Sequence, residues 1–149
     1  METSSISTNN INDKKILLVD DEKDILTLYH ECLETWGFPT VSFDNPVDAL
    51  NHVNTDNNIS DYSLIITDYR MPQMNGLDFI QHIRERYSVN DDNCQLKVIL
   101  ISAFVISEFT LKEKVPHLKI DKIIEKANSF RTSQKRNRKI TWVHILNIQ

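Results

Sequence analysis

The sequence is poor in glycine, in cysteine and in long apolar runs, and each shortage disfavours a class of protein. Only two glycines occur among 149 residues, and neither follows the first apolar segment. A flavin or nucleotide binder needs a phosphate loop rich in glycine, serine or threonine there. The two cysteines, Cys32 and Cys94, match no metal or redox spacing, so a reduced, cytoplasmic setting is expected. No run reaches 18 apolar residues, so no membrane span is expected.

The composition suits one globular domain, and the charge is unevenly distributed. Hydrophobic residues make up 40% of the chain and charged residues 26%. Residues 1–13 are polar and lack a secretory pattern, so we interpret them as a disordered leader. Because the chain carries −4 and residues 131–149 carry +5, the remainder carries −9. An acidic body disfavours nucleic acid as the main ligand and suits carboxylates gathered around a cation.

From residue 14 onward, short apolar runs alternate with amphipathic stretches. The runs predict five buried strands, at residues 15–19, 40–43, 62–67, 96–101 and 122–125. Such an alternation predicts a parallel sheet with helices on both faces, and right-handed crossovers led us to expect alternate helices on opposite faces.

Helical periodicity predicts the segments between these strands. The first helix has one apolar face, formed by Ile25, Leu28, Tyr29, Cys32, Leu33 and Trp36, and we interpret Cys32 as a core residue. Gly37 ends it. Asn45-Pro46 opens the second, with Val47, Leu50 and Val53 facing inward and a loop over residues 54–60. The third helix carries Leu77, Ile80, Ile83 and Tyr87. A weak fourth covers residues 105–115 and stops at Pro116.

The end of the chain fits two interpretations. A fifth helix should begin near Ser129, but residues 131–139 are basic and polar, and residues 140–148 form an apolar run. The segment 131–149 is either a distorted last helix or an extension that docks on this domain or on a partner.

Polar residues follow four of the predicted strands. Asp20, Asp21 and Glu22 follow the first strand, Asp68 the third, Ser102 the fourth and Lys126 the fifth. Sites in open parallel sheets form at the carboxyl ends of strands, so these side chains should converge. Each alone has a structural explanation, such as a turn, a helix cap or a solvated lysine. Their joint occurrence at strand ends favours a site.

Clustered carboxylates repel one another unless a cation lies between them, and Mg²⁺ suits an all-oxygen site. Asp68 could then attack phosphorus and form an aspartyl phosphate. Lys126 and the metal would neutralise the transferred group, and the Ser102 hydroxyl would donate a hydrogen bond to it.

Four segments resemble the receiver domains of two-component response regulators. They are ILLVDDEKDI (16–25), LIITDYRMPQMNGLDFI (64–80), VILISA (98–103) and IIEKA (123–127). The resemblance covers about residues 14–130. It implies an α/β fold of the flavodoxin-like, doubly wound kind, a five-stranded parallel sheet in the order 2-1-3-4-5 with flanking helices.

By this resemblance, Asp68 is the phosphoacceptor, and Ser102 and Lys126 contact the phosphoryl oxygens. The implied Mg²⁺ ligands are Asp20, Asp21, Asp68 and the backbone carbonyl of Arg70. The phosphoryl group would come from a histidine kinase or a phosphotransfer protein. The chain would assist its own phosphorylation and dephosphorylation without being an enzyme for another substrate. It would signal to an unidentified protein through the face built from helix four, strand five and helix five.

The chain departs from the family pattern at four places. Ala127 stands where a proline usually follows the lysine, and Ile123 where an aromatic switch residue is frequent. Arg70 and Phe104 are bulky at the variable positions flanking the acceptor, and we expect them to hinder the hydrolytic water. The last helix is atypical. These departures keep a second function open, a receiver-like protein-binding module that is not phosphorylated.

Overall fold

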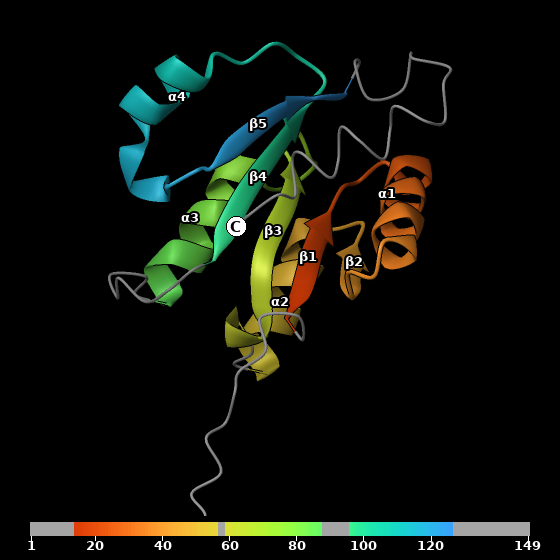
Figure 1. The fold of residues 1–149 in the computed structure, drawn as a ribbon. Helices are drawn as coiled ribbons and strands as arrows, with labels where there is room; N and C mark the ends of the chain where they lie inside the picture. The colour runs from red at the N-terminus through yellow and green to blue at the C-terminus, as the bar shows by residue number, and fades with distance from the viewer. Residues whose placement is uncertain (1–13, 57–58, 88–95, 127–149) are drawn as a thin grey trace, which may run out of the picture.

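The computed structural model describes residues 14–56, 59–87 and 96–126, which form one parallel sheet flanked by helices (Figure 1). The strands are β1 (Lys15–Val19), β2 (Thr40–Phe43), β3 (Tyr62–Asp68), β4 (Lys97–Ser102) and β5 (Lys122–Glu125). They pair in the order β2-β1-β3-β4-β5, and every pairing is parallel. The predicted fold class and strand order are therefore confirmed, and each strand lies within one residue of its predicted bounds.

Within the described residues, four helices and two 3₁₀ turns connect the strands. The helices are α1 (Lys23–Thr35), α2 (Pro46–Asp56), α3 (Gly76–Arg86) and α4 (Glu108–Lys114), and the 3₁₀ turns are η2 (Ile59–Asp61) and η3 (Pro116–Leu118). Gly37 has a φ of +87°, the left-handed conformation that ends helices, as predicted for the end of α1. No helix within the described ranges is long and apolar enough to cross a membrane.

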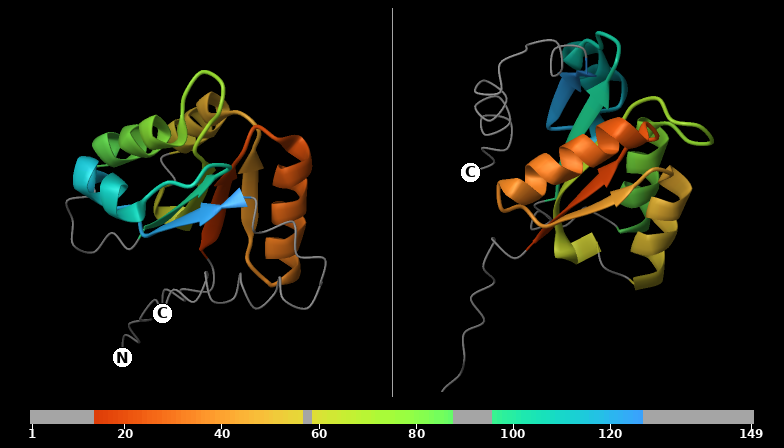
Figure 2. Two further views of the ribbon diagram at one scale, coloured as in Figure 1. Left: turned by 90° about the horizontal axis from the view of Figure 1, so that it is seen from above. Right: turned by 90° about the vertical axis from the view of Figure 1, so that its right-hand side faces the viewer.

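The helices divide unequally between the two faces of the sheet (Figure 2). Tyr29 and Leu33 of α1 pack on one face. Buried residues of α2 and α3, together with Leu111 of α4, pack on the other. The expectation of strict alternation was wrong. The connection from β1 leads to β2 at one edge of the sheet, and every later connection runs across the sheet in the opposite direction. Right-handed crossovers therefore place α1 on one face and α2, α3 and α4 on the other.

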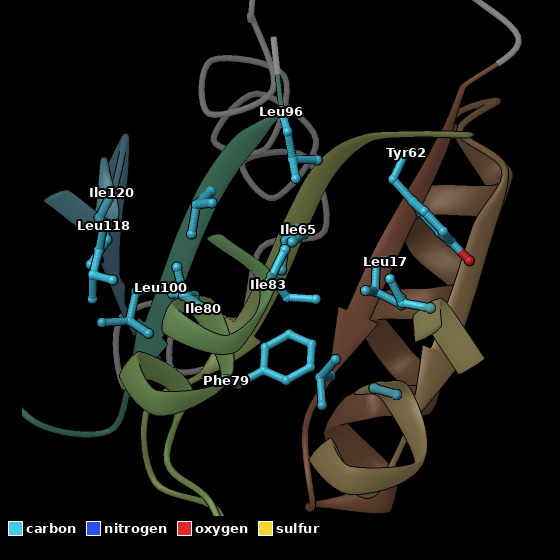
Figure 3. Packing of buried hydrophobic residues seen from close by; sticks show 14 of the residues in the cluster. Leu17, Tyr62, Ile65, Phe79, Ile80, Ile83, Leu96, Leu100, Leu118 and Ile120 are labelled. Carbon is cyan, nitrogen blue, oxygen red and sulfur yellow. The ribbon is translucent and has the colours of Figure 1, made fainter. Parts of the chain in front are cut away.

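The larger core cluster lies between the sheet and the α2/α3 layer (Figure 3). The Phe79 ring of α3 is fully buried there, beside inward residues of the central strands such as Leu17, Ile65 and Leu100. On the opposite face, Ile16 and its like-facing neighbours pack under α1. Burial on both faces explains why these strands are continuous apolar runs rather than alternating ones.

Three details of the predicted elements differ from the structure. Val47 is 36% exposed, and Ala49 is fully buried instead, beside Leu50 and Val53. The inward face of α2 is thus offset from the predicted one. The loop expected over residues 54–60 is also wrong in part, because α2 continues to Asp56. Cys32 of α1 is only half-buried, and not the core residue that was predicted.

Arg84 joins α3 to the turn that leads into β5. Its Nε donates to the carbonyl of Leu118 at 3.1 Å, and its Nη2 donates to the carbonyls of Lys119 and Leu96 at 3.3 and 3.4 Å. The Asp121 carboxylate accepts from the backbone N–H of Val98 at 2.7 Å. These bonds fix the start of β5 beside β4, and the register of β5 then determines where Lys126 lies.

Several predictions lie outside the described residues. They concern the leader (residues 1–13), Cys94, the loop at 88–95, Ala127, the helix expected near Ser129, and residues 131–149.

Candidate functional site

Four buried polar residues meet at the carboxyl ends of the adjacent strands β1, β3, β4 and β5. Asp20, Asp68, Ser102 and Lys126 are each at most 6% exposed. Register places them together, because Asp68 pairs with Ile101, one residue before Ser102, and Ser102 pairs with the residue before Lys126. The side chains predicted from the strand ends therefore share one edge of the sheet.

Lys126 is held among three carboxylates. Its Nζ lies 2.8 Å from Glu22 Oε1, 2.9 Å from Asp20 Oδ2 and 3.3 Å from Asp68 Oδ1. The buried ammonium of Lys126 and the buried carboxylates of Asp20 and Asp68 need charged partners, and they serve as partners for one another. The lysine that the sequence predicted at the end of β5 thus reaches the Asp68 carboxylate and the acids after β1.

Glu22 is the site residue to which the sequence reasoning gave no role. It was counted with the acidic cluster after the first strand, but its pairing with Lys126 joins residues 104 positions apart in the chain. Its backbone N–H also donates to Asp20 Oδ1 at 2.9 Å. The sequence signal for Glu22 was its place as the third acid of the DDE segment. That signal indicates a contact with Lys126 only once the position of Lys126 in space is known.

The carboxylates of Asp20, Asp21 and Asp68 form a group suited to a hard divalent cation. One oxygen from each lies within 4.8 Å of the others. Asp20 Oδ2 is buried and, among the described residues, accepts no hydrogen bond, although the Lys126 ammonium lies 2.9 Å away. A buried carboxylate oxygen without a hydrogen bond is costly, and a metal ion, or a water molecule bound to one, would satisfy it. An all-oxygen donor set of this kind fits Mg²⁺.

The ionisable groups perturb one another strongly. Burial raises the pKa of Asp68 to about 6, and the charge of Asp20 adds to this rise while Lys126 opposes it. Burial also raises the pKa of Asp20, against the hydrogen bond from Lys126. Burial alone would lower the pKa of Lys126, but its hydrogen bonds to Glu22 and Asp20 outweigh burial, and its pKa is raised. Lys126 therefore stays charged at neutral pH, and a further cation would favour the ionised form of Asp68.

Ser102 and two bulky side chains lie at the ends of β3 and β4. The Ser102 Oγ accepts a hydrogen bond from the backbone N–H of Phe104 at 3.1 Å. The guanidinium carbon of Arg70 lies 4.1 Å from the centre of the Phe104 ring, a cation–π contact. The two variable positions thus form one stack that links the loop after Asp68 to the loop after Ser102.

The loop between β3 and α3 is built on close backbone contacts. Asn75 caps α3 by accepting from the Asp78 N–H at 2.9 Å. The Gly76 N–H donates to the Tyr69 carbonyl at 2.8 Å. Gln73 has a φ of +71°, a left-handed conformation uncommon for a residue with a side chain. The loop thereby folds back under the end of β3.

Comparison with known proteins identifies the family. The model of the response regulator receiver domain family matches residues 16–136. This chain belongs to that family. It is therefore a receiver domain of two-component response regulators, a family in which phosphoaspartate and magnesium are typical.

Individual relatives agree with this assignment. The receiver domain is 34% identical over 71 residues to the transcriptional regulatory protein CpxR homolog of Haemophilus influenzae, covering 48% of this chain and 29% of that protein. It is 30% identical over 91 residues to the response regulator receiver protein CpdR of Brucella abortus, covering 61% of this chain and 68% of that protein. The receiver domain thus spans less than a third of the first relative's length.

A solved structure supports the same assignment. The response regulator TrrA of Thermotoga maritima, crystallised in complex with Mg²⁺-BeF, is 27% identical, with a TM-score of 0.59. The match covers 87% of this chain and 98% of that one.

Proposed function

We propose that this receiver domain accepts a phosphoryl group on Asp68 and signals through a phosphorylation-dependent change in protein–protein contacts. One observation carries the proposal. The buried Asp68 carboxylate lies 3.3 Å from the Lys126 ammonium and in reach of a cation shared with Asp20 and Asp21. A purely structural module has no use for four buried polar side chains at one sheet edge, because each costs free energy to desolvate.

The chemistry follows from the positions of these groups. An Asp68 carboxylate oxygen attacks phosphorus while the bond from phosphorus to the donor's imidazole nitrogen breaks. The bonding electrons stay with the imidazole, which takes a proton from solvent. In this proposal Lys126 and Ser102 contact the phosphoryl oxygens, because an ammonium and a hydroxyl suit the developing negative charge.

Mg²⁺ is the cofactor that the donor set fits. We propose that Asp20, Asp21, Asp68 and the backbone carbonyl of Arg70 hold it, with Asp21 a direct ligand and Asp20 acting through water. When bound, the ion offsets the charge of the carboxylates and of the incoming group. The Mg²⁺-BeF complex of TrrA supports this proposal by similarity.

The phosphoryl donor is proposed to be a histidine kinase or a phosphotransfer protein in the cytoplasm. The signal is proposed to pass from this receiver domain to another protein. Nucleic acid is not the proposed ligand, because the body of the chain is acidic. Ile123 of β5 is half-buried against the core, so a ring-rotation switch at this position is replaced by an aliphatic contact.

The alternative, which the aliphatic Ile123 keeps open, is a receiver-like binding module without phosphorylation. Treatment with acetyl phosphate separates the two. Addition of one phosphoryl group that requires both Mg²⁺ and Asp68 supports the phosphoacceptor, and no addition supports the module.

A further inference from the structure

Glu22 begins α1, yet its side chain turns away from that helix. Glu22 is the N-cap residue of α1, and its side chain makes no capping hydrogen bond. Its Oε1 accepts from Lys126 Nζ at 2.8 Å instead. Its backbone N–H is meanwhile anchored to Asp20 Oδ1 at 2.9 Å. Glu22 is thus fixed at its backbone and extended toward Lys126 at its carboxylate.

This contact competes with the contact that phosphorylation requires. An ammonium has three donors, and Lys126 directs hydrogen bonds to Glu22 and Asp20 while standing 3.3 Å from Asp68. A phosphoryl group on Asp68 brings new anionic oxygens that need a donor from the same ammonium. Phosphorylation of Asp68 leaves the donor nearest Asp68 for one phosphoryl oxygen, and a second phosphoryl oxygen then competes with the remaining carboxylate partners of Lys126.

Of these carboxylates, Glu22 is the one able to yield. Its side chain is 56% exposed, against 1% for Asp20 and 5% for Asp68. A carboxylate that returns to water regains its hydration, whereas a buried one left without its cation does not. The long glutamate side chain can also rotate outward while its backbone bond to Asp20 persists.

We propose that Glu22 is a positioning residue that holds Lys126 toward β1 and releases it when phosphoryl oxygens arrive. This proposal rests on the proposed function of the site: the Glu22 carboxylate competes with the phosphoryl oxygens for the Lys126 ammonium. The anion that enters must displace Glu22, so the Glu22 carboxylate weakens binding of phosphoryl-like anions and slows phosphorylation.

The test compares Glu22→Gln with the wild type in binding beryllofluoride, measured by calorimetry at saturating Mg²⁺ and fixed ionic strength. Glutamine keeps the size and removes the charge. In the wild type, binding of beryllofluoride must break the charge-assisted hydrogen bond between Lys126 and Glu22. Because Glu22→Gln lacks this bond, it should bind beryllofluoride roughly three- to tenfold more tightly. Glu31→Gln is the control, since it removes one exposed charge from the same helix. Glu22→Ala should behave like Glu22→Gln, which excludes an effect peculiar to the amide.

A second readout does not depend on anion binding. In metal-free wild type, the Lys126 ammonium should give a ¹⁵N-resolved signal protected from exchange by its carboxylate partners, and Glu22→Gln should shift and broaden it. Unchanged or weaker beryllofluoride binding in Glu22→Gln would overturn the inference, as would an equal gain in Glu31→Gln. If the wild type binds beryllofluoride and the variants do not differ from it, the inference alone fails. If the wild type binds none, the proposed function fails with it.

Discussion

A β-carbon at Gly76 would lie 2.3 Å from the carbonyl oxygen of Asp68, so the start of α3 rests directly on the backbone of the proposed phosphoacceptor. The same atom would lie 3.0 Å from Leu100 Cδ1. Such separations leave no room for a side chain, and the obstructing atom is backbone rather than a flexible side chain. The third helix therefore positions Asp68 through the absence of a side chain at residue 76.

Gly76→Ala is predicted to impair both stability and phosphorylation. The backbone of β3 or of α3 must move to admit the methyl group, at a cost of about 1–3 kcal/mol of unfolding free energy. The same movement displaces Asp68 from its ion pair with Lys126. Urea unfolding and the initial rate of labelling by acetyl phosphate measure the two effects.

Gly37→Ala supplies the matched control, because a β-carbon there meets nothing within 4 Å and the φ of +87° alone opposes it. This variant should lose about 1 kcal/mol of stability through backbone strain and keep its labelling rate. A wild-type labelling rate in Gly76→Ala would contradict the positioning argument.

The strands could be predicted from the sequence because burial on both faces leaves continuous apolar runs. The convergence of Asp20, Asp68, Ser102 and Lys126 could be predicted because carboxyl ends of parallel strands share an edge. The tight contact of Gly76 could not, since it depends on how closely α3 approaches β3. The ion pair of Glu22 with Lys126 was equally inaccessible, because the strand-end pattern does not show which acid after β1 the lysine will contact.

The errors had similar causes. Val47 was assigned to the core because an apolar residue early in a helix fits several faces, and only packing against the sheet selects Ala49. The positions of Arg70 and Phe104 at neighbouring strand ends were visible in the sequence. Their direct stacking required the geometry of two loops.

Asp68→Asn is predicted to stabilise the metal-free protein at pH 8. A folded-state pKa near 6, against the ordinary 3.8, means that the folded protein holds the Asp68 proton more tightly than the unfolded chain. Stability contributed by this group is then present below about pH 4 and lost as the pH rises through 6. Asparagine never ionises, so the variant should gain on the order of 1–3 kcal/mol over wild type at pH 8.

Denaturant unfolding at several pH values in the presence of EDTA measures this difference. The gain should shrink toward pH 4, where the wild-type carboxyl is protonated. Asp61→Asn, which removes an exposed carboxylate, should show no comparable gain. Wild-type and Asp68→Asn stabilities that run parallel between pH 4 and pH 8 would contradict the buried-carboxylate argument.

The stack of Arg70 on Phe104 is predicted to slow the loss of the phosphoryl group. It bridges the two loops beside Asp68, and we expect it to hinder the approach of the hydrolytic water. Removing either side chain by Arg70→Ala or Phe104→Ala should speed autodephosphorylation roughly two- to fivefold, the effect of a contact worth about 0.5–1 kcal/mol. Decay of the phosphorylated species after removal of the donor gives the rate.

The double variant tests whether the two side chains act as one unit. If they do, its rate should match that of either single variant rather than the product of both effects. Arg86→Ala, on the exposed side of α3, should decay as the wild type does. Unchanged decay in both single variants would rule out the stack as a barrier.

The most direct test of the central claim is the intact mass of the purified protein after acetyl phosphate, with Mg²⁺ and with EDTA, beside Asp68→Asn. We predict the gain of one phosphoryl group in the wild type with Mg²⁺, and none with EDTA or in the variant. No gain in the wild type, under conditions that label a known receiver, would contradict the account, as would an equal gain in Asp68→Asn.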